Sequence, residues 1–375
     1  MAETGSPSRS SPIRVAIVAP SLGILGGQSV QADHLIQAWH GDPEVAAWLV
    51  PINPVPPGPL RRALGVKYIR TMTTQLFYWP LLLRELRRAD VVHIFSASYF
   101  SFLLAPLPAV LVAKLLRRPV LMNYHSGEAP DHLKRSRVAR TTLAAVERNA
   151  VPSRFLAGVL ASFGIEAEVV PNVVDMDRFA FRPRGRPRPR LLSTRNFETL
   201  YNVACTLRAF RLVQDWYPEA TLTLVGGGSQ EQALRALAGS LGLNHVTFTG
   251  RVPPAEIWRY YADADIYVQT PAIDNMPVSV LEAFASGTAV VSTNVGGVSA
   301  IVTDERDGLL VPADDHAALA RQVLRLLDEP GLAERITARA RQDCEQYTWR
   351  EVRAKWLSLY RDALRNHRSP AGRAA

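Results

Sequence analysis

The chain has 375 residues with a formal net charge of +9, 47% hydrophobic and 21% charged residues, a composition that excludes a disordered protein and allows two or three domains. The basic excess favours an anionic partner such as a phosphate-bearing substrate, an acidic membrane surface or a nucleic acid. The only two cysteines, Cys205 and Cys344, could form one disulfide but neither a disulfide framework nor a cysteine metal site, so the expected compartment is a reducing cytosol.

The N-terminal part of the chain predicts an α/β domain. Residues 1–12 are rich in Ser, Pro and Gly and predict a loose tail, not a signal peptide. Residues 13–20 form a β-branched run typical of a buried parallel strand, and residues 30–39 have helical spacing. Further strands are expected at residues 46–52, 91–95 and 119–125. Because helical patterns separate these strands, residues 13–180 predict a Rossmann-like domain with a parallel sheet.

One uncharged stretch has the length of a membrane span. Val91–Ala113 contains no Asp, Glu, Lys or Arg. Serines interrupt it, and Pro106 and Pro108 lie where a spanning helix should be continuous. The stretch therefore predicts a buried strand, a loop and a buried helix.

A linker and a second α/β domain are expected next. Residues 181–190 carry arginines at alternate positions together with prolines, which predicts an extended, solvated linker. Residues 191–347 then predict a second Rossmann-like domain, and residues 348–366 a final amphipathic helix that could cross back to the first domain, before a second loose tail. The strands expected here are 190–195, 220–226, 245–250, 265–270, 289–293 and 308–312, and the helices include 202–213 and 279–287. Two such domains are expected to face each other across a cleft at the carboxyl ends of their sheets.

The most informative stretch is Asp274–Gly297. Asp274 and Glu282 are eight residues apart, and Pro277 between them predicts the start of a helix. The free N–H groups and the positive end of the dipole at such a start suit a diphosphate. Carboxylates beside it can accept hydrogen bonds from sugar hydroxyls. Two unrelated surface acids would leave the surrounding glycines unexplained.

This stretch resembles the E-x7-E region of the retaining glycosyltransferases of family 4, which have the GT-B fold. The residues that match are Pro277, Leu281, Glu282, Ala283, Gly287, Val290, Val291, Thr293, Gly296 and Gly297. Other segments resemble the family's first glycine loop and its P-S, P-N, G-x-G and F-x-G-x-V segments: Gly26–Gln28, Val151–Phe155, Val169–Phe179, Val225–Leu234 and Val246–Val252. An ordered set that runs from about Ile13 to about Tyr347 is much more specific than any one motif.

The resemblance implies roles for residues around the donor sugar. Asp274 and the backbone amides after it, those of Asn275 and Met276, would hold the sugar hydroxyls. Glu282 would bind the ribose hydroxyls. His125, at the end of a strand of the first domain, would face the donor sugar, although a single histidine at a strand end is more often structural.

The resemblance also implies how the nucleotide is held. Arg195 would counter the charge on the leaving phosphate. Gly27 would let the N-terminal loop approach the diphosphate closely, and Gly250 and its neighbours would border the base. The amides presented to the diphosphate would be those of Val278, Ser279 and Val280.

The chain departs from the family pattern at three places. Asp274 stands where the family has Glu. The family's Lys about five residues after Arg195 is missing, because residues 195–202 contain no Lys. Ala300 replaces an acid after the glycine pair. The diphosphate has therefore lost one of its two usual cations.

Two further sequence signals are weaker. Asp263 and Asp265 fit a metal-binding D-x-D pattern, but they lie at an expected helix end that leads into a strand, so we interpret the pattern as coincidence. Between Pro57 and Arg118 basic residues outnumber acidic ones and accompany Phe77, Tyr78 and Trp79. This mixture suits an anionic membrane surface or a merely solvated face. We expect no nucleic-acid partner, because no module that binds DNA or RNA is visible.

Together these observations predict a metal-independent, retaining glycosyltransferase of the GT-B fold, with no cofactor and with a UDP- or GDP-sugar as donor. The acceptor would be a glycan, a lipid or a small molecule, and the protein would be cytoplasmic or peripheral on the inner face of the membrane. Two alternatives stay open: a catalytically impaired sugar-nucleotide-binding protein and a GT-B sugar-nucleotide epimerase.

Overall fold

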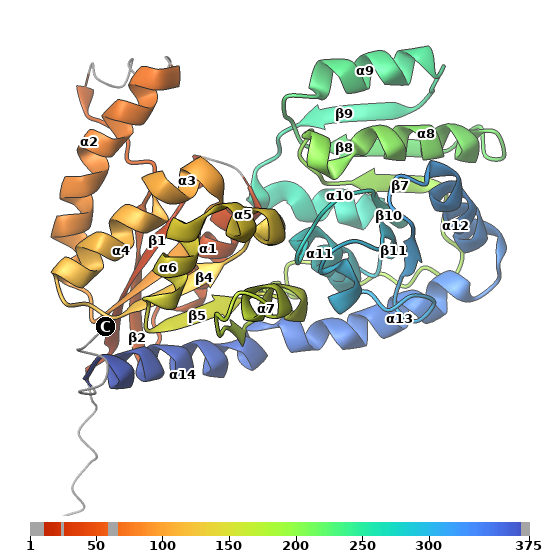
Figure 1. Cartoon of the computed structure of the whole chain (residues 1–375). Helices are drawn as coiled ribbons and strands as arrows, with labels where there is room; N and C mark the ends of the chain where they lie inside the picture. The colour runs from red at the N-terminus through yellow and green to blue at the C-terminus, as the bar shows by residue number, and fades with distance from the viewer. Residues whose placement is uncertain (1–10, 24–25, 59–66, 369–375) are drawn as a thin grey trace, which may run out of the picture.

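The computed structural model describes residues 11–23, 26–58 and 67–368, which form two α/β domains side by side (Figure 1). Most of the two terminal tails, residues 1–10 and 369–375, lies outside the described residues. Each domain is built on a six-stranded sheet in which every pairing is parallel. The two doubly wound domains expected from the sequence are therefore confirmed.

The first domain has the strand order β2-β1-β3-β4-β5-β6. Its strands are β1 (Ile13–Ala19), β2 (Val45–Pro51), β3 (Val91–Ser96), β4 (Val120–Tyr124), β5 (Arg148–Val151) and β6 (Glu168–Val169). Its helices are α1 (Gly27–Ala38), α2 (Lys67–Leu86), α3 (Tyr99–Leu104), α4 (Pro106–Leu115), α5 (Ala129–Arg135), α6 (Arg137–Ala144) and α7 (Arg154–Ala161). The uncharged stretch is the buried strand β3 followed by α3 and α4, and none of the described helices is long and apolar enough to cross a membrane.

The second domain has the strand order β12-β11-β10-β7-β8-β9. Its strands are β7 (Arg190–Ser193), β8 (Thr221–Val225), β9 (Val246–Gly250), β10 (Ile266–Gln269), β11 (Ala289–Thr293) and β12 (Leu309–Val311). Its helices are α8 (Val203–Gln214), α9 (Glu231–Ser240), α10 (Ile257–Asp263), α11 (Val278–Ser286), α12 (His316–Asp328) and α13 (Leu332–Cys344). Cys205 and Cys344 are both buried as free thiols.

The final helix, α14 (Trp349–Arg368), runs back from the second domain beneath the first (Figure 1). Its apolar side chains Trp356 and Tyr360 are buried in one core with Val15 and Ile17, which point to one face of β1. The Tyr360 hydroxyl lies 2.9 Å from Nδ1 of His93 on β3. One face of the first domain's sheet is thus closed by the last helix of the chain.

The interdomain segment is mostly exposed, as its composition predicts, but it is also anchored to the second domain through Arg184 and Arg188. Arg184 is only 2% exposed, and its guanidinium donates to the carbonyl oxygens of Tyr261 and Ala264 at 3.0 and 2.8 Å. Asp265, 1% exposed, accepts from the backbone amide and Nε of Arg188 at 2.7 and 2.9 Å. Burial would raise the pKa of Asp265, but its arginine partners hold that pKa below the ordinary value. The second acid of the D-x-D pattern therefore holds the linker.

Both sheets have a switch point, where the strand order reverses and the outgoing loops diverge. It lies between β1 and β3 in the first domain and between β7 and β10 in the second. In open α/β sheets, ligands bind in the crevice outside the carboxyl ends of the strands at this point. The loops that follow β7 and β10 begin at Thr194 and Thr270. A ligand site of the second domain is therefore expected at these two loops.

Candidate functional site

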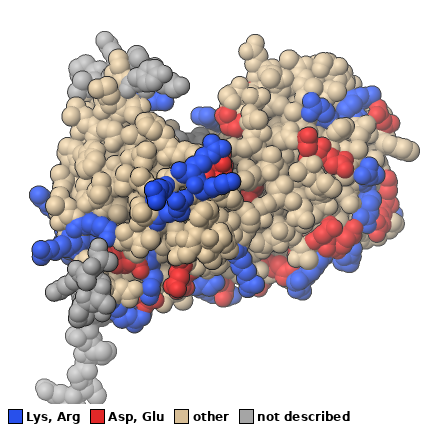
Figure 2. Space-filling view, viewed as in Figure 1, with Lys and Arg blue, Asp and Glu red and all other residues tan. Residues whose placement is uncertain are grey.

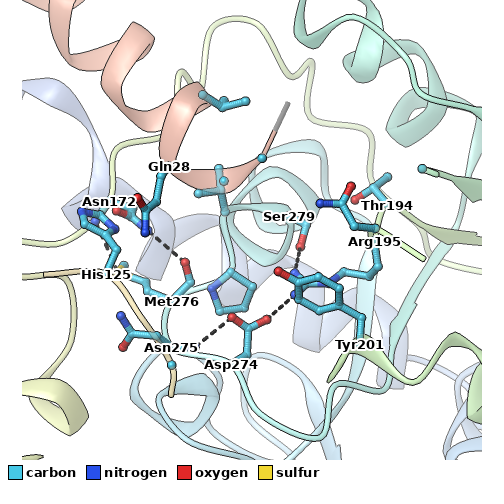
Figure 3. A pocket seen from close by; sticks show the side chains of 18 of the residues that line it. Gln28, His125, Asn172, Thr194, Arg195, Tyr201, Asp274, Asn275, Met276 and Ser279 are labelled. Carbon is cyan, nitrogen blue, oxygen red and sulfur yellow. Dashed lines mark hydrogen bonds and ion pairs between the residues drawn. The ribbon is translucent and has the colours of Figure 1, made fainter. Parts of the chain in front are cut away.

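A cavity of about 410 Å³ lies between the domains and is lined by the loops that follow strands of both sheets (Figure 3). The first domain contributes loop residues after β1, β3 and β4. The second contributes loop residues after β7, β8, β9 and β10. Of the residues expected to act from sequence, the lining includes Gly27, His125, Arg195, Asp274, Asn275, Met276, Val278, Ser279 and Glu282.

Arg195 and Asp274 meet at the switch point of the second sheet, because β7 and β10 are neighbours. Arg195 Nη2 lies 2.5 Å from Asp274 Oδ2, and Nη1 donates to Ser279 Oγ at 3.3 Å. The ring of Tyr201 covers the guanidinium, with its centroid 4.1 Å from Cζ (Figure 3). Burial alone would lower the pKa of Arg195, but Asp274 and the neighbouring tyrosines raise it above its ordinary value. The guanidinium therefore stays charged at any physiological pH.

This pairing joins two residues to which the resemblance assigned separate roles. Asp274 Oδ1 also accepts from the backbone amide of Asn275 at 2.8 Å. A sugar hydroxyl that binds Asp274 must therefore share the carboxylate with Arg195. The tyrosine that occupies the region of the family's lysine, Tyr201, is itself a wall of the cavity.

The glycine pair of the family pattern supports the Asp274 loop from behind. A Cβ on Gly296 would lie 2.1 Å from the carbonyl oxygen of Asp274, and one on Gly297 would lie 2.0 Å from that of Asn275. Gly296 also has a positive φ of +53°, and the amide of Gly297 donates to the Asp274 carbonyl at 3.1 Å. Only glycine allows this close approach. The pair thus fixes the backbone that carries the candidate site.

The N-terminus of α11 faces the cavity with Pro277 as its cap. The first amides of a helix have no partner within the helix. The amide of Val280, however, donates to the carbonyl oxygen of Pro277 at 3.1 Å, and the fully buried Val280 side chain does not line the cavity. This leaves the amides of Val278 and Ser279 to present to an anion, one fewer than the sequence suggested.

Glu282 lies one turn further along α11, at the wall of the cavity. The Tyr261 hydroxyl donates to Glu282 Oε2 at 2.9 Å and lies 2.8 Å from Thr194 Oγ1. Burial raises the pKa of Glu282 to about 7, although the bond from Tyr261 opposes the change. The carboxyl group is therefore fixed in place and only partly ionised at neutral pH, with Oε1 left for a ligand.

His125 follows β4 and reaches the cavity from the first domain (Figure 3). Its ring stacks on Phe95 with centroids 5.1 Å apart, and its buried Nε2 has no hydrogen-bond partner among the described residues. Burial lowers its pKa to about 4, so the imidazole is neutral at physiological pH. The neutral ring therefore lies at the cavity wall with a buried nitrogen whose hydrogen-bonding capacity is unused.

The P-S and P-N segments join the two domains at the site. The Ser153 hydroxyl, which also caps α7, donates to Asn275 Oδ1. Asn172 Nδ2 donates to the carbonyl oxygen of Met276 at 2.9 Å (Figure 3). Two residues of the first domain therefore hold the loop of the second that carries Asp274.

At the base end one position differs from the expectation. Gly250 itself is not among the lining residues, whereas its neighbours Arg251 and Val252 are. Arg251 is exposed and has no ion-pair partner among the described residues. It escaped notice because one arginine after a strand cannot be distinguished by sequence from a solvated one. Val225, Val252 and Ile257 form an apolar wall at this end of the cavity, and Arg251 adds one cation to it.

Comparisons with known proteins agree with this geometry. The family described as Glycosyltransferase Family 4 matches residues 25–178, and the family described as Glycosyl transferases group 1 matches residues 177–343. A phosphatidyl-myo-inositol mannosyltransferase of Mycobacterium leprae is 31% identical over 208 residues, which are 54% of this chain. The chain spans about half of that relative's length, 55%.

Solved structures share the fold over nearly the whole chain. A sucrose-phosphate synthase from Thermosynechococcus elongatus superposes with a TM-score of 0.73 at 20% identity, covering 93% of this chain and 98% of its own. The Anabaena protein HepE in complex with UDP-glucose gives 0.72 at 17% identity, covering 92% and 100%. The two family matches are contiguous and cover both domains that line the cavity. The chain is therefore a member of the group 1 glycosyltransferases of family 4, with the GT-B fold.

Proposed function

We propose that the protein transfers a sugar from a nucleoside-diphosphate sugar to an acceptor hydroxyl, with retention of configuration and without a divalent metal. One observation carries the proposal. A charged guanidinium, the free N-terminus of α11 and a fixed carboxyl group line one cavity between the domains. These are the groups that a diphosphate and a ribose require.

The nucleotide would lie along the carboxyl edge of the second sheet. The amides of Val278 and Ser279, with Arg195, would bind the diphosphate, and Glu282 would accept hydrogen bonds from the ribose diol. The base would rest against the apolar wall that contains Val252. The sugar would then point toward Asp274 and His125, where the first domain closes the cavity.

The reaction needs no protein nucleophile in this arrangement. The bond between the anomeric carbon and the phosphate oxygen breaks, and its electron pair leaves with the nucleoside diphosphate. The acceptor oxygen bonds to the anomeric carbon on the same face, and its proton passes to the departing phosphate. Arg195 and the α11 amides are fixed where negative charge develops, so they stabilise the transition state more than the ground state.

We further propose a lipid or glycan acceptor and a cytoplasmic location that can include the inner membrane face. Two facts support this. The mycobacterial relative is named for a phosphatidyl-inositol lipid, and the first domain exposes an unusual number of apolar side chains.

A second candidate is a sugar-nucleotide-binding protein with impaired catalysis. Two observations favour it. Tyr201 stacks on Arg195 in the region where the family pattern has a lysine, and Arg195 is already paired with Asp274. Donor hydrolysis in the absence of acceptor separates the candidates, because only the transferase should release the nucleoside diphosphate.

Thermal unfolding with a panel of UDP- and GDP-sugars and matched nucleosides tests the site itself. A ligand that binds only the folded protein raises its melting temperature. We expect at least one nucleotide sugar to stabilise the protein, and expect Glu282→Ala to abolish that shift. If no nucleotide sugar in the panel changed the melting temperature, the proposed donor site would be wrong.

A further inference from the structure

The helix α2 exposes a second set of apolar side chains besides Tyr78, Leu82 and Leu86, which it buries in the core of the first domain. Large apolar residues recur along one stripe of the helix, where they are 49%, 75%, 70% and 40% exposed: Ile69, Met72, Leu76 and Trp79. The polar Gln75, in contrast, turns inward and donates to the carbonyl oxygen of Leu104 at 2.9 Å. An ordinary surface helix buries its apolar stripe and exposes its polar residues. The sequence of α2 therefore fits a helix whose outer face meets an apolar environment.

The neighbouring helices α3 and α4 also expose large apolar side chains. Phe100 and Leu103 on α3 are 67% and 40% exposed, and Leu111 and Leu115 on α4 are 50% and 74% exposed. The bonds from Gln75 to Leu104 and from Tyr78 to Ala105 connect α2 to the junction of α3 and α4. We call the exposed apolar residues of these three helices the apolar face. Single exposed apolar residues are normal, but so large a group marks an interaction surface.

The segment that carries the apolar face has an excess of positive charge. Within residues 67–118 the only acids are Glu85 and Asp90, and both are in ion pairs with arginines. The basic residues there include Arg70, Arg87 and Arg117, all exposed. Tyr99, the first residue of α3, donates to Asp131 of α5 at 2.7 Å. Figure 2 shows Lys and Arg gathered in the middle of the view, where Figure 1 places α5 and α6.

We propose that the apolar face binds an anionic phospholipid bilayer and that the acceptor is a lipid presented from it. Exposed apolar side chains on a segment with an excess of cations suit the boundary between acidic headgroups and acyl chains. A second copy of the chain would bring the same positive charges against these ones, so self-association is the weaker explanation. The choice of acceptor rests on the proposed function; the binding of the bilayer does not.

The position of the face relative to the cavity supports a lipid acceptor. Ser98, the residue directly before α3, lines the cavity, as do Ser126 and Glu128 in the loop before α5. Helix α3, which carries part of the apolar face, and α5, to which Tyr99 is bonded, therefore both start at the first-domain wall of the cavity. A headgroup hydroxyl held at the rim would have a short path to the donor sugar, without extraction of the whole lipid.

Flotation of the purified full chain with vesicles tests this inference. Vesicles of phosphatidylcholine alone are compared with vesicles that also contain phosphatidylglycerol, at low and high salt. The double variant Met72→Gln/Leu76→Gln alters the apolar face. The matched control, Leu212→Gln/Trp216→Gln, alters residues of the second domain that are 36% and 76% exposed. We expect the wild type and the control to bind anionic vesicles in a salt-dependent manner, and the face variant to bind roughly tenfold more weakly.

Two results would overturn the inference. One is equal binding of the face variant and the wild type. The other is a dimer in sedimentation that the face variant dissociates, which would make the face an interface between copies. Calorimetric affinity for UDP and GDP is measured on the same samples. Loss of vesicle binding with unchanged nucleotide affinity supports the docking face, whereas absence of nucleotide binding in every sample would refute the proposed function and leave the docking result intact.

Discussion

Arg195 is the residue on which the proposed chemistry depends most, because it is the cation fixed at the switch point. We expect Arg195→Ala to lower kcat about a hundredfold or more while KM changes less, since the guanidinium acts mainly on charge that develops in the transition state. Steady-state kinetics with Arg211→Ala as control, which removes an exposed guanidinium of α8, checks this. A near-normal kcat for Arg195→Ala would mean that backbone amides alone stabilise the leaving group.

Tyr201 offers the converse test at the same place. Its ring covers Arg195 and lines the cavity, so a substituted side chain would enter the diphosphate site. We expect Tyr201→Lys to keep or raise activity by restoring a second cation, and Tyr201→Phe, which preserves the stacked ring, to behave like the wild type. Loss of activity in the lysine variant alone would show that the stacked ring is needed to position Arg195.

Glu282 predicts a pH dependence of nucleotide affinity. Its pKa of about 7 in the free protein lies above the ordinary value of 4.5, so the carboxyl group is mostly protonated at pH 6. A ribose diol donates to the ionised form, and we therefore expect affinity to rise about tenfold from pH 6 to pH 8. Calorimetry with a nucleoside diphosphate measures it. Glu282→Gln should remove the part of the pH dependence that comes from Glu282 and leave the part that comes from the phosphate. An unchanged pH dependence would contradict the assignment of Glu282 to the ribose.

At the scale of elements, the loop-to-helix junction of α1 can be tested through Gly27. A Cβ at this position would meet no atom within 4 Å, so the fold itself does not require glycine there. Alanine also has the higher helix propensity. We expect Gly27→Ala to leave the melting temperature unchanged or higher and to weaken donor binding. Gly239→Ala in α9, where the space is equally open, should leave binding unchanged; equal behaviour of both variants would refute a diphosphate role for Gly27.

Most strands were predictable from sequence, but the contacts between distant elements were not. The β-branched runs of β1, β3 and β11 show their burial directly, whereas β5 begins with polar residues and β6 has only two residues. The acid pair and the helix start near Pro277 were equally visible. That Ser153 and Asn172 would bond to the loop of the other domain was not, because no local pattern encodes a contact across more than a hundred residues.

The anchoring of the linker, with Arg184 buried and Arg188 bonded to Asp265, was missed for a related reason. Alternating arginine and proline indicate an extended, polar segment, and this local conclusion holds. Composition does not reveal that Asp265 and the carbonyl oxygens at the end of α10 form a matching acceptor surface. The pattern in the sequence predicts the backbone, and only the tertiary structure decides the exposure.

At the scale of the whole molecule, α14 holds the first domain to the second. Trp356 is 4% exposed in the core under the first sheet. We expect Trp356→Ala to lower the free energy of unfolding by about 3 kcal/mol or more, because it removes a large buried side chain. Denaturant titration measures this, with Trp216→Ala, which is 76% exposed, expected to change little. Equal stability of the two variants would mean that α14 does not contribute to this core.

The central claim is that the cavity between the domains binds and activates a nucleotide sugar. The most direct test is release of nucleoside diphosphate from UDP- and GDP-sugars, measured with and without a chelator, by the wild type, Glu282→Ala and Arg195→Ala. We predict slow release by the wild type from one donor class, undiminished by the chelator, and almost none by either variant. Release from no donor, release that the chelator abolishes, or release that both variants retain would contradict the account.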